Sequence, residues 1–288
     1  MDVLIIGGGP AGVSAALYTA RAGLETVIIK KSYGALDKAE KVDNFYGAAG
    51  VSGRGLVGSG LAQAVGVGAK VIDGEVVKIE QDMSSNHFTV ETAHDVYSAK
   101  TVLLATGASR ATPAIPGLDK YEGKGVSHCA VCDAFFFKGK DVAVLGSGNY
   151  ALSEAKELLP LVNSVTLLTN GKEPEIQFPS EITVRSEKIR SVVGEARLMG
   201  VAFEPNGEEL PVSGLFIAMG IAGASELARK IGIPVDKGSL MVDKNMRTDM
   251  PGIWAAGDCT GGMKQIAKAV YEGAVAGTDI VRFIRGQS

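Results

Sequence analysis

The chain has 288 residues, of which 46% are hydrophobic and 21% are charged, and its formal net charge is -3. This composition is typical of a folded protein of about two domains and excludes a disordered chain. The net charge and the lack of a basic tract argue against nucleic acid as the main partner. No apolar run approaches the roughly 18 residues of a membrane span, and the chain begins with a strand instead of a signal peptide, so we expect a cytoplasmic protein without membrane contact.

The first predicted element is a strand over residues 3–6, an uninterrupted apolar run typical of a buried parallel sheet. A G-x-G-x-x-G turn and a predicted helix over 14–21 follow it, which is the context of a dinucleotide-binding turn. Gly7 permits the tight turn, Gly9 lets a pyrophosphate approach the backbone, and Gly12 allows close packing of the helix.

A second strand is predicted over 26–29, and it ends in Lys30–Lys31 where an acidic residue commonly holds a ribose. The ribose contact is therefore unassigned. Residues 34–68, rich in glycine and alanine, predict a loop followed by a helix. The alternating segments 70–77 and 88–92 predict a small accessory sheet.

A buried strand over 101–105 precedes Pro113 and Pro116, which break the pattern, and we place the first domain boundary there. Beyond it, Cys129 and Cys132 have two residues between them, a spacing that allows low-pKa thiolates able to exchange electrons with a disulfide. Zinc would need four ligands, and the three cysteines and three histidines include no second cysteine pair, so we expect no metal site.

Asp133 directly follows the cysteine pair. Its carboxylate can take and return the proton that thiol-disulfide exchange moves, and we favour this function over a turn cap. His128 could tune the adjacent Cys129, although an ordinary loop histidine explains it equally well. Cys259 could be a reactive thiol, but we favour a small buried residue.

A second dinucleotide-type unit follows, with a strand over 141–145, a G-x-G-x-x-A turn over 146–151, a helix over 151–159 and a strand over 164–168. Two Rossmann-like units predict either two nucleotide sites or one site and its relic. Lys172 is the only basic residue between positions 161 and 181, whereas an NADPH 2′-phosphate normally needs an arginine.

Pro174 and Pro179 keep the segment after this strand short and irregular, without a long amphipathic helix. Near the end of the chain, Asp258 stands at a predicted strand end beside a glycine turn, where a carboxylate could hold a sugar-phosphate linker. The other elements predicted in this part are a strand over 215–220, a helix over 225–231, a return crossing at 250–252, a strand over 253–256 and a helix over 264–284.

Taken together, these motifs resemble the low-molecular-weight thioredoxin reductase family over nearly the whole chain. Several short motifs in the right order are more specific than any one of them. The matching pieces are Gly7–Gly12, Asp43–Phe45, Ala105–Gly107, Cys129–Asp133 with Phe135–Phe137 after it, Gly146–Ala151, Gly257–Asp258 and Lys264–Ile266.

The resemblance implies an α/β protein with two Rossmann-like, three-layer ββα domains. Residues 1–114 and 243–288 would form a discontinuous FAD domain, and residues 115–242 an inserted NAD(P)H-binding-like domain that carries the cysteines. It also implies a homodimer that rotates the inserted domain to present the thiols to thioredoxin.

By the same resemblance, Cys132 would face the flavin, Cys129 would attack thioredoxin, and Asp133 would donate the proton. Asp258 would hold the ribityl-phosphate region. The full set of implied FAD-binding residues is Gly7, Gly9, Pro10, Ala11, Gly12, Asn44, Ala105, Thr106, Gly107, Gly257, Asp258, Lys264, Gln265 and Ile266.

The chain departs from the family in the electron donor. Where NADPH users carry a His-Arg-Arg cluster, it reads Thr169–Pro174, and in this it resembles the ferredoxin-linked flavin thioredoxin reductases. We therefore expect reduced ferredoxin as donor, with NAD(P)H as the alternative. A flavin-dependent dithiol oxidase and a non-catalytic redox scaffold are further alternatives. Four lysines could form a ferredoxin-docking patch or an ordinary solvated surface: Lys30, Lys31, Lys38 and Lys41.

Overall fold

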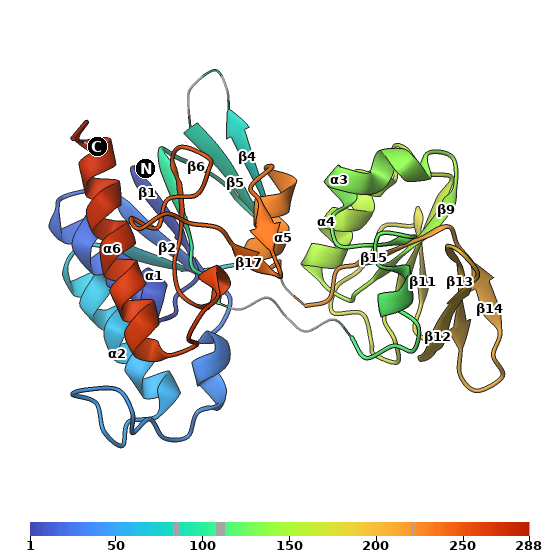
Figure 1. Cartoon of the computed structure of the whole chain (residues 1–288), viewed down its shortest axis with the longest axis horizontal. Coiled ribbons are helices and arrows are strands. Elements are labelled where there is room, and N and C mark those ends of the chain that lie inside the picture. Colours follow the sequence, from blue (N-terminus) through green and yellow to red (C-terminus); the bar gives the residue numbers. More distant parts are fainter. Residues whose placement is uncertain (83, 85–86, 108–112, 221, 288) are drawn as a thin grey trace. The chain divides into compact units, whose positions relative to one another are not determined.

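The computed structural model describes residues 1–82, 84, 87–107, 113–220 and 222–287. The chain forms two compact units, one of Met1–Arg110 together with Gly223–Ser288, and the other of Ala111–Ala222 (Figure 1). The chain thus leaves the first unit and returns to it. Residues 223–242 pack with the first unit, whereas the sequence placed the return near residue 243.

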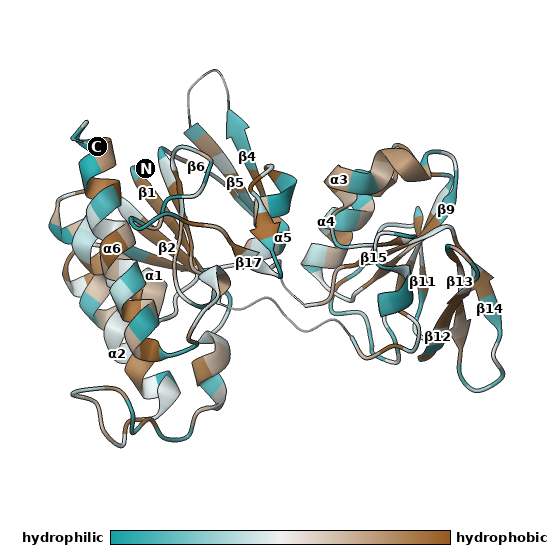
Figure 2. Cartoon of the chain, viewed as in Figure 1, coloured by the Kyte–Doolittle hydropathy of each residue, from teal (hydrophilic) through white to brown (hydrophobic). Residues whose placement is uncertain are grey.

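The first unit is built on a parallel sheet with strand order β18-β7-β1-β2-β3. Its central strands consist almost wholly of buried Val, Ile and Leu, which explains their uninterrupted apolar sequences and their brown colour in Figure 2. The strands are β1 (Val3–Ile6), β2 (Thr26–Lys30), β3 (Lys70–Asp73), β7 (Thr101–Leu104) and β18 (Ile253–Ala255).

Helices α1 (Pro10–Arg21), α2 (Gly53–Gly66) and α6 (Ile266–Ile284) cover one face of this sheet (Figure 1). Helix α6 packs directly against α1 at Gly273. The helices are so close there that a Cβ on Gly273 would lie 2.1 Å from the Ala11 carbonyl oxygen. The contact joins the two ends of the chain into one unit.

An antiparallel sheet forms the third layer, with strands β4 (Val76–Asp82), β5 (His87–Thr92) and β6 (Val96–Ala99). The predicted accessory sheet is therefore present, but the assignment of all of residues 70–77 to it was wrong. Residues 70–73 pair with β2 in the main sheet, and only the residues from Val76 onward enter the accessory sheet. Alternation indicates a strand but not the sheet that it joins.

The remaining elements of the first unit are short. Helix α5 is tied to β4 by a hydrogen bond from Lys230 Nζ to the Val77 carbonyl oxygen at 3.2 Å. The bounds are η1 (Gly34–Lys38), α5 (Ala224–Lys230), β16 (Val235–Asp236), β17 (Ser239–Leu240) and η4 (Asp258–Thr260).

The second unit repeats the three-layer plan, with a parallel sheet in the order β11-β10-β9-β15-β8 and an antiparallel sheet β12-β13-β14. As the two prolines predicted, residues 169–181 form neither a helix nor a strand. The elements are η2 (Asp119–Tyr121), β8 (Val126–Ser127), α3 (Ala130–Asp133), η3 (Ala134–Phe137), β9 (Asp141–Leu145), α4 (Asn149–Leu158), β10 (Ser164–Leu168), β11 (Ile182–Arg185), β12 (Ile189–Gly194), β13 (Leu198–Phe203), β14 (Glu209–Pro211) and β15 (Gly214–Ile217).

Both units therefore have the predicted α/β, ββα architecture. Within the described ranges, none of the helices combines the length and the apolar character needed to span a membrane.

Candidate active site

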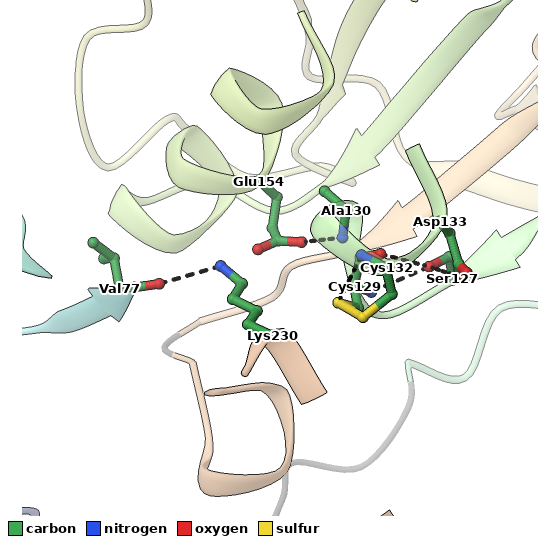
Figure 3. The surroundings of a disulfide bond; sticks show 8 residues. All are labelled: Val77, Ser127, Cys129, Ala130, Cys132, Asp133, Glu154 and Lys230. Atoms are coloured by element: carbon green, nitrogen blue, oxygen red, sulfur yellow. Dashed lines mark hydrogen bonds between the residues drawn. A yellow bond between two sulfur atoms is a disulfide. The ribbon is translucent and has the colours of Figure 1, made fainter. Parts of the chain in front are cut away.

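The two cysteines of the second unit form a disulfide, with their Cα atoms 5.3 Å apart (Figure 3). Cys129 is the N-cap of α3, and its Sγ accepts a hydrogen bond from the Cys132 backbone N–H at 3.2 Å. Cys129 is only 2% exposed, whereas Cys132 belongs to the exposed surface. Cys132 is thus the more exposed residue of the pair.

The carboxylate of Asp133 is connected to the disulfide through a hydroxyl group. Ser127 Oγ donates to Asp133 Oδ2 at 2.7 Å and accepts from the Cys129 N–H at 3.1 Å (Figure 3). The Asp133 N–H in turn donates to the Cys129 carbonyl oxygen at 3.2 Å. The acid is thus held beside the cysteine pair by a network that the sequence analysis missed, since Ser127 lies six residues before Asp133 in another element.

Glu154 was also missed, although it lies beside the disulfide. It projects from α4 with 1% of its surface exposed, and its Oε2 accepts a hydrogen bond from the Ala130 N–H at 2.7 Å (Figure 3). A buried carboxylate therefore fixes the backbone between the two cysteines. The only sequence signal was a glutamate on the apolar face of a predicted helix.

The other two candidates near reactive groups have structural partners. His128 Nε2 lies 3.1 Å from Glu122 Oε1, so the His128 ring has a carboxylate partner. Cys259 is buried as predicted, and its thiol donates to the Ala256 carbonyl oxygen at 3.3 Å. Burial raises the pKa of Cys259 to about 12, so this side chain stays a thiol at neutral pH.

In the first unit, the Gly-rich turn between β1 and α1 is tightly packed on one side and open on the other. Gly7 has φ +117°, and a Cβ there would meet the Ala105 carbonyl oxygen at 2.2 Å. A Cβ on Gly12 would lie 2.0 Å from the Gly7 carbonyl oxygen, whereas one on Gly9 would meet nothing within 4 Å. The open side at Gly9 is the side from which a pyrophosphate would approach the backbone.

The C-terminal motif meets this turn. A Cβ on Gly257, which has φ +89°, would lie 3.0 Å from Ala11 Cβ, so Asp258 follows a glycine packed on the start of α1. Two further predicted residues, far apart in the sequence, also come together: Asn44 Nδ2 donates to Gln265 Oε1 at 2.9 Å.

The remaining predicted residues lie at or next to the ends of β7, α1 and α6. Pro10 occupies the first turn of α1, Ile266 begins α6, and Lys264 is exposed just before it. Ala105–Gly107 directly follow β7, and a Cβ on Gly107 would meet nothing within 4 Å.

A buried network that the sequence did not reveal supports the Gly257 turn. Glu272 Oε2 accepts from the Gly257 N–H at 2.8 Å and from Thr260 Oγ1 at 2.9 Å. Lys268 lies 3.1 Å from the same carboxylate and donates to the Gly257 and Gly261 carbonyl oxygens, each at 2.7 Å. The spacing of four residues between Lys268 and Glu272 was the available signal.

The lysines that follow β2 are paired with carboxylates. Lys30 binds Asp73, and Lys31 Nζ lies 2.7 Å from Glu75 Oε2. Lys41 pairs with Asp43 at 2.8 Å, and the side chain of Lys38 lies outside the described residues. The three described lysines therefore belong to mixed-charge pairs and not to a purely basic patch.

The second Gly-rich turn is also tightly built, but its open side is covered. A Cβ on Gly146 would lie 2.3 Å from the Ala218 carbonyl oxygen, which parallels Gly7. A Cβ on Gly148 would instead meet Glu175 Oε2 at 2.9 Å, and Ser147 Oγ donates to Glu175 Oε1 at 2.8 Å.

Comparison with known proteins decides the family. Residues 1–273 match the sequence profile of the pyridine nucleotide-disulphide oxidoreductases. The chain belongs to this family. Within it, the chain is 32% identical to a thioredoxin reductase of Listeria monocytogenes, with 98% of this chain and 93% of that protein covered.

Solved structures give the same grouping. The atypical thioredoxin reductase TRi of Desulfovibrio vulgaris Hildenborough has a TM-score of 0.92 and 38% identity, covering 99% of this chain and 98% of that one. A ferredoxin-flavin thioredoxin reductase of Clostridium acetobutylicum has a TM-score of 0.74 and 31% identity, with the same coverage. The protein is thus a thioredoxin reductase-like flavin disulfide oxidoreductase.

Members of the thioredoxin reductase family bind FAD, and the first unit of this oxidoreductase fits that cofactor. Gly9 leaves the backbone of the turn accessible, as described above. Thr106 Oγ1 is buried and has no hydrogen-bond partner in the described part of the chain, so a ligand atom would satisfy it. The chemistry of an FAD site and the geometry of the turn therefore agree.

Proposed function

We propose that this flavoenzyme reduces thioredoxin through Cys129 and Cys132, and that reduced ferredoxin supplies the electrons. The observation that carries the first half is the Cys129–Cys132 disulfide with the Asp133 carboxylate held beside it by Ser127. The relatives described above are themselves named thioredoxin reductases.

When bound, FAD would supply a carrier that can take up electrons one at a time and give up two together, which the reduction of a disulfide requires. Reduction of the disulfide takes up two electrons and two protons and gives two thiols. As a thiolate, Cys129 attacks one sulfur of the thioredoxin disulfide, which breaks that S–S bond, releases the other thioredoxin sulfur as a thiolate and leaves a mixed disulfide. Cys132 then attacks Cys129 and releases the second thioredoxin sulfur, while Asp133 holds and returns the proton.

We propose that the FAD contacts are made by the residues that the sequence predicted for them. The backbone at Gly7, Gly9 and Gly12 would hold the pyrophosphate at the start of α1. Asp258 would hold the ribityl-phosphate region, and Asn44, Thr106 and Gln265 would lie near the flavin. Pro10, Ala11, Ala105, Gly107, Gly257, Lys264 and Ile266 would complete the site.

An exposed apolar surface beside the disulfide supports a protein substrate. Phe135 is 72% exposed and Phe136 is 69% exposed, and Val131 lies between the cysteines with 47% exposed. Large apolar side chains that cluster on a surface mark sites of protein contact. We propose that thioredoxin docks on these three residues and presents its own disulfide to the dithiol.

The second unit supports ferredoxin as the electron donor. Lys172 is the only basic residue between positions 161 and 181, and the described segment between β10 and β11 contains no helix that could present others. A 2′-phosphate bound there would keep most of its charge unpaired. One-electron transfer from a ferredoxin needs no nucleotide site, so the missing basic residues support this donor.

A nicotinamide donor is the second candidate, because the turn keeps Gly146, Gly148 and Ala151 and NADH carries no 2′-phosphate. Anaerobic titration of the oxidised holoenzyme with NADPH, NADH and reduced ferredoxin separates the two. We expect only ferredoxin to bleach the flavin absorbance. Prompt bleaching by NADPH or NADH would overturn the ferredoxin proposal.

We also propose a cytoplasmic homodimer with the functional domain boundaries given by the sequence, 1–114 with 243–288 and 115–242. Sedimentation of the purified holoenzyme tests the dimer, and a monomer at micromolar concentration would contradict it.

A further inference from the structure

The segment between β10 and β11 lies across the second Gly-rich turn and is fixed there at two points. The Glu175 backbone N–H donates to the Ser147 carbonyl oxygen at 2.7 Å. The Glu175 side chain accepts from Ser147 Oγ at 2.8 Å, and its second oxygen lies 2.9 Å from the place where a Cβ on Gly148 would stand. Main chain and side chain together hold a carboxylate on the turn.

This position has a defined meaning in a dinucleotide-binding fold. Gly148 is the N-cap of α4, and no side chain caps that helix end through a hydrogen bond. In a working site the pyrophosphate of the dinucleotide lies at this point, close to the second glycine and to the helix N-terminus. Here the protein places its own anion beside the same glycine.

We infer that Glu175 is a specificity-determining residue, whose carboxylate occupies the pyrophosphate position of the second turn and excludes nicotinamide dinucleotides. The inference deepens the proposed function, because it rests on the donor being other than NAD(P)H. It assigns that property to one side chain, whereas the missing basic residues only weaken the binding of a 2′-phosphate.

Charge and space both oppose the nucleotide. A pyrophosphate brought to Gly148 would overlap the Glu175 carboxylate and would meet a charge of its own sign. Glu173, two residues earlier, adds a second negative charge to the segment, and Lys172 is the basic residue beside it. The close contact and the repulsion centre on Glu175, so changing this residue should have the larger effect.

Two variants separate charge from space. Glu175→Gln removes the charge and keeps the shape, and Glu175→Ala removes both. Glu173→Gln is the matched control, because it removes one negative charge from the same segment without touching the turn. Glu175 is exposed, so all three variants should fold, which flavin content and thermal unfolding would verify.

The measurement is isothermal titration calorimetry of each oxidised holoenzyme with NADH and with NADPH. We expect no binding by the wild type or by Glu173→Gln. For Glu175→Ala we expect NADH affinity to rise by roughly tenfold or more, with a smaller rise for Glu175→Gln. NADPH should gain no more than NADH, because the segment over residues 169–181 contains no arginine for its 2′-phosphate.

The outcomes distinguish this inference from the donor proposal. If neither Glu175 variant binds NADH better than Glu173→Gln, and the wild type is also silent, the assignment to Glu175 is wrong while ferredoxin remains the donor. If the wild type binds NADH and its flavin is bleached by it, both the donor proposal and the assignment to Glu175 fail.

Discussion

The two Gly-rich turns of this molecule share a sequence motif and a position between a buried strand and a helix, and they differ in what lies against them. In each, the first glycine packs against the carbonyl oxygen of a neighbouring segment, Gly7 on Ala105 and Gly146 on Ala218. At the next glycine of the motif they diverge, because Gly9 faces open space and Gly148 faces Glu175. The fold provides the turn, and a single residue from a distant loop decides whether an anion can use it.

The helices that follow the two turns also differ in what they contact. Ala15 of α1 is a small residue packed closely on Gly277 of α6, which holds the two chain ends together. The corresponding position of α4 is Glu154, whose carboxylate binds the backbone between the cysteines. The first helix thus supports a cofactor site, and the second supports a disulfide. The following predictions test this division, beginning with the largest expected effect.

Loss of one cysteine should remove the dithiol with which the second unit reduces thioredoxin. We expect Cys132→Ser to lower thioredoxin reduction by about a thousandfold or more, because no dithiol can then form. Flavin content and flavin reduction by the donor should stay unchanged. Stopped-flow absorbance of the flavin and a thioredoxin-coupled assay measure the two steps separately.

Cys259→Ala is the control for this prediction, since that thiol is buried and bonded to carbonyl oxygens. It should retain thioredoxin reduction. Full activity of Cys132→Ser would show that the disulfide has no catalytic function.

A matched pair of substitutions tests the turns directly. Gly9 has φ -78° and Gly148 has φ -125°, so valine fits the backbone at either position. Gly9→Val should weaken FAD binding by roughly tenfold or more, because its side chain fills the space that a pyrophosphate needs. Gly148→Val should keep its FAD and only displace the Glu175 side chain.

Flavin release during dialysis, followed by fluorescence, measures this difference. Equal loss of FAD from both variants would contradict the division between the turns, and so would full retention by both. Thermal unfolding of the two proteins without FAD controls for general damage to the fold.

The sequence predicted the turns and the disulfide pair because each depends on neighbours in the chain. Gly7–Gly12 lies between a buried strand and a helix, and that local pattern is sufficient. The contact of Glu175 with Ser147 joins residues 28 positions apart through a segment without periodicity. Nothing local determines its path, and the same reason hid Ser127 and Glu154 from the sequence analysis.

Glu154 provides the third test. Glu154→Ala should lower the free energy of unfolding by about 1–3 kcal/mol, because the Ala130 N–H loses its buried acceptor. The glutamine variant keeps an acceptor oxygen and should recover much of this loss. Ala15→Gly in α1 is the counterpart in the first unit, and denaturant unfolding of both proteins checks the pair. An unchanged unfolding midpoint for Glu154→Ala would mean that the carboxylate does not support the α3 backbone.

The smallest effects are expected at two aspartates beside the strands that lead into the Gly-rich turns, Asp2 just before β1 and Asp141 at the start of β9. Hydrogen bonding to the Lys100 ammonium, and then to the Glu25 N–H, lowers the pKa of Asp2. The Ser164 hydroxyl and the Asn163 amide lower the pKa of Asp141. A carboxyl whose pKa is lower in the folded state contributes stability above its ordinary pKa of 3.8, and this contribution is lost as the pH falls through the folded value.

At pH 7 we therefore expect Asp2→Asn and Asp141→Asn each to cost about 0.5–1 kcal/mol, with the difference from wild type vanishing in acid. Salt should reduce the loss for Asp2→Asn, whose partner is charged, and leave that for Asp141→Asn unchanged, since its partners are neutral. Thermal unfolding midpoints between pH 3 and pH 7, at low and high salt, measure both effects. Equal salt dependence in the two variants would show that the charge of Lys100 contributes nothing beyond a neutral hydrogen bond.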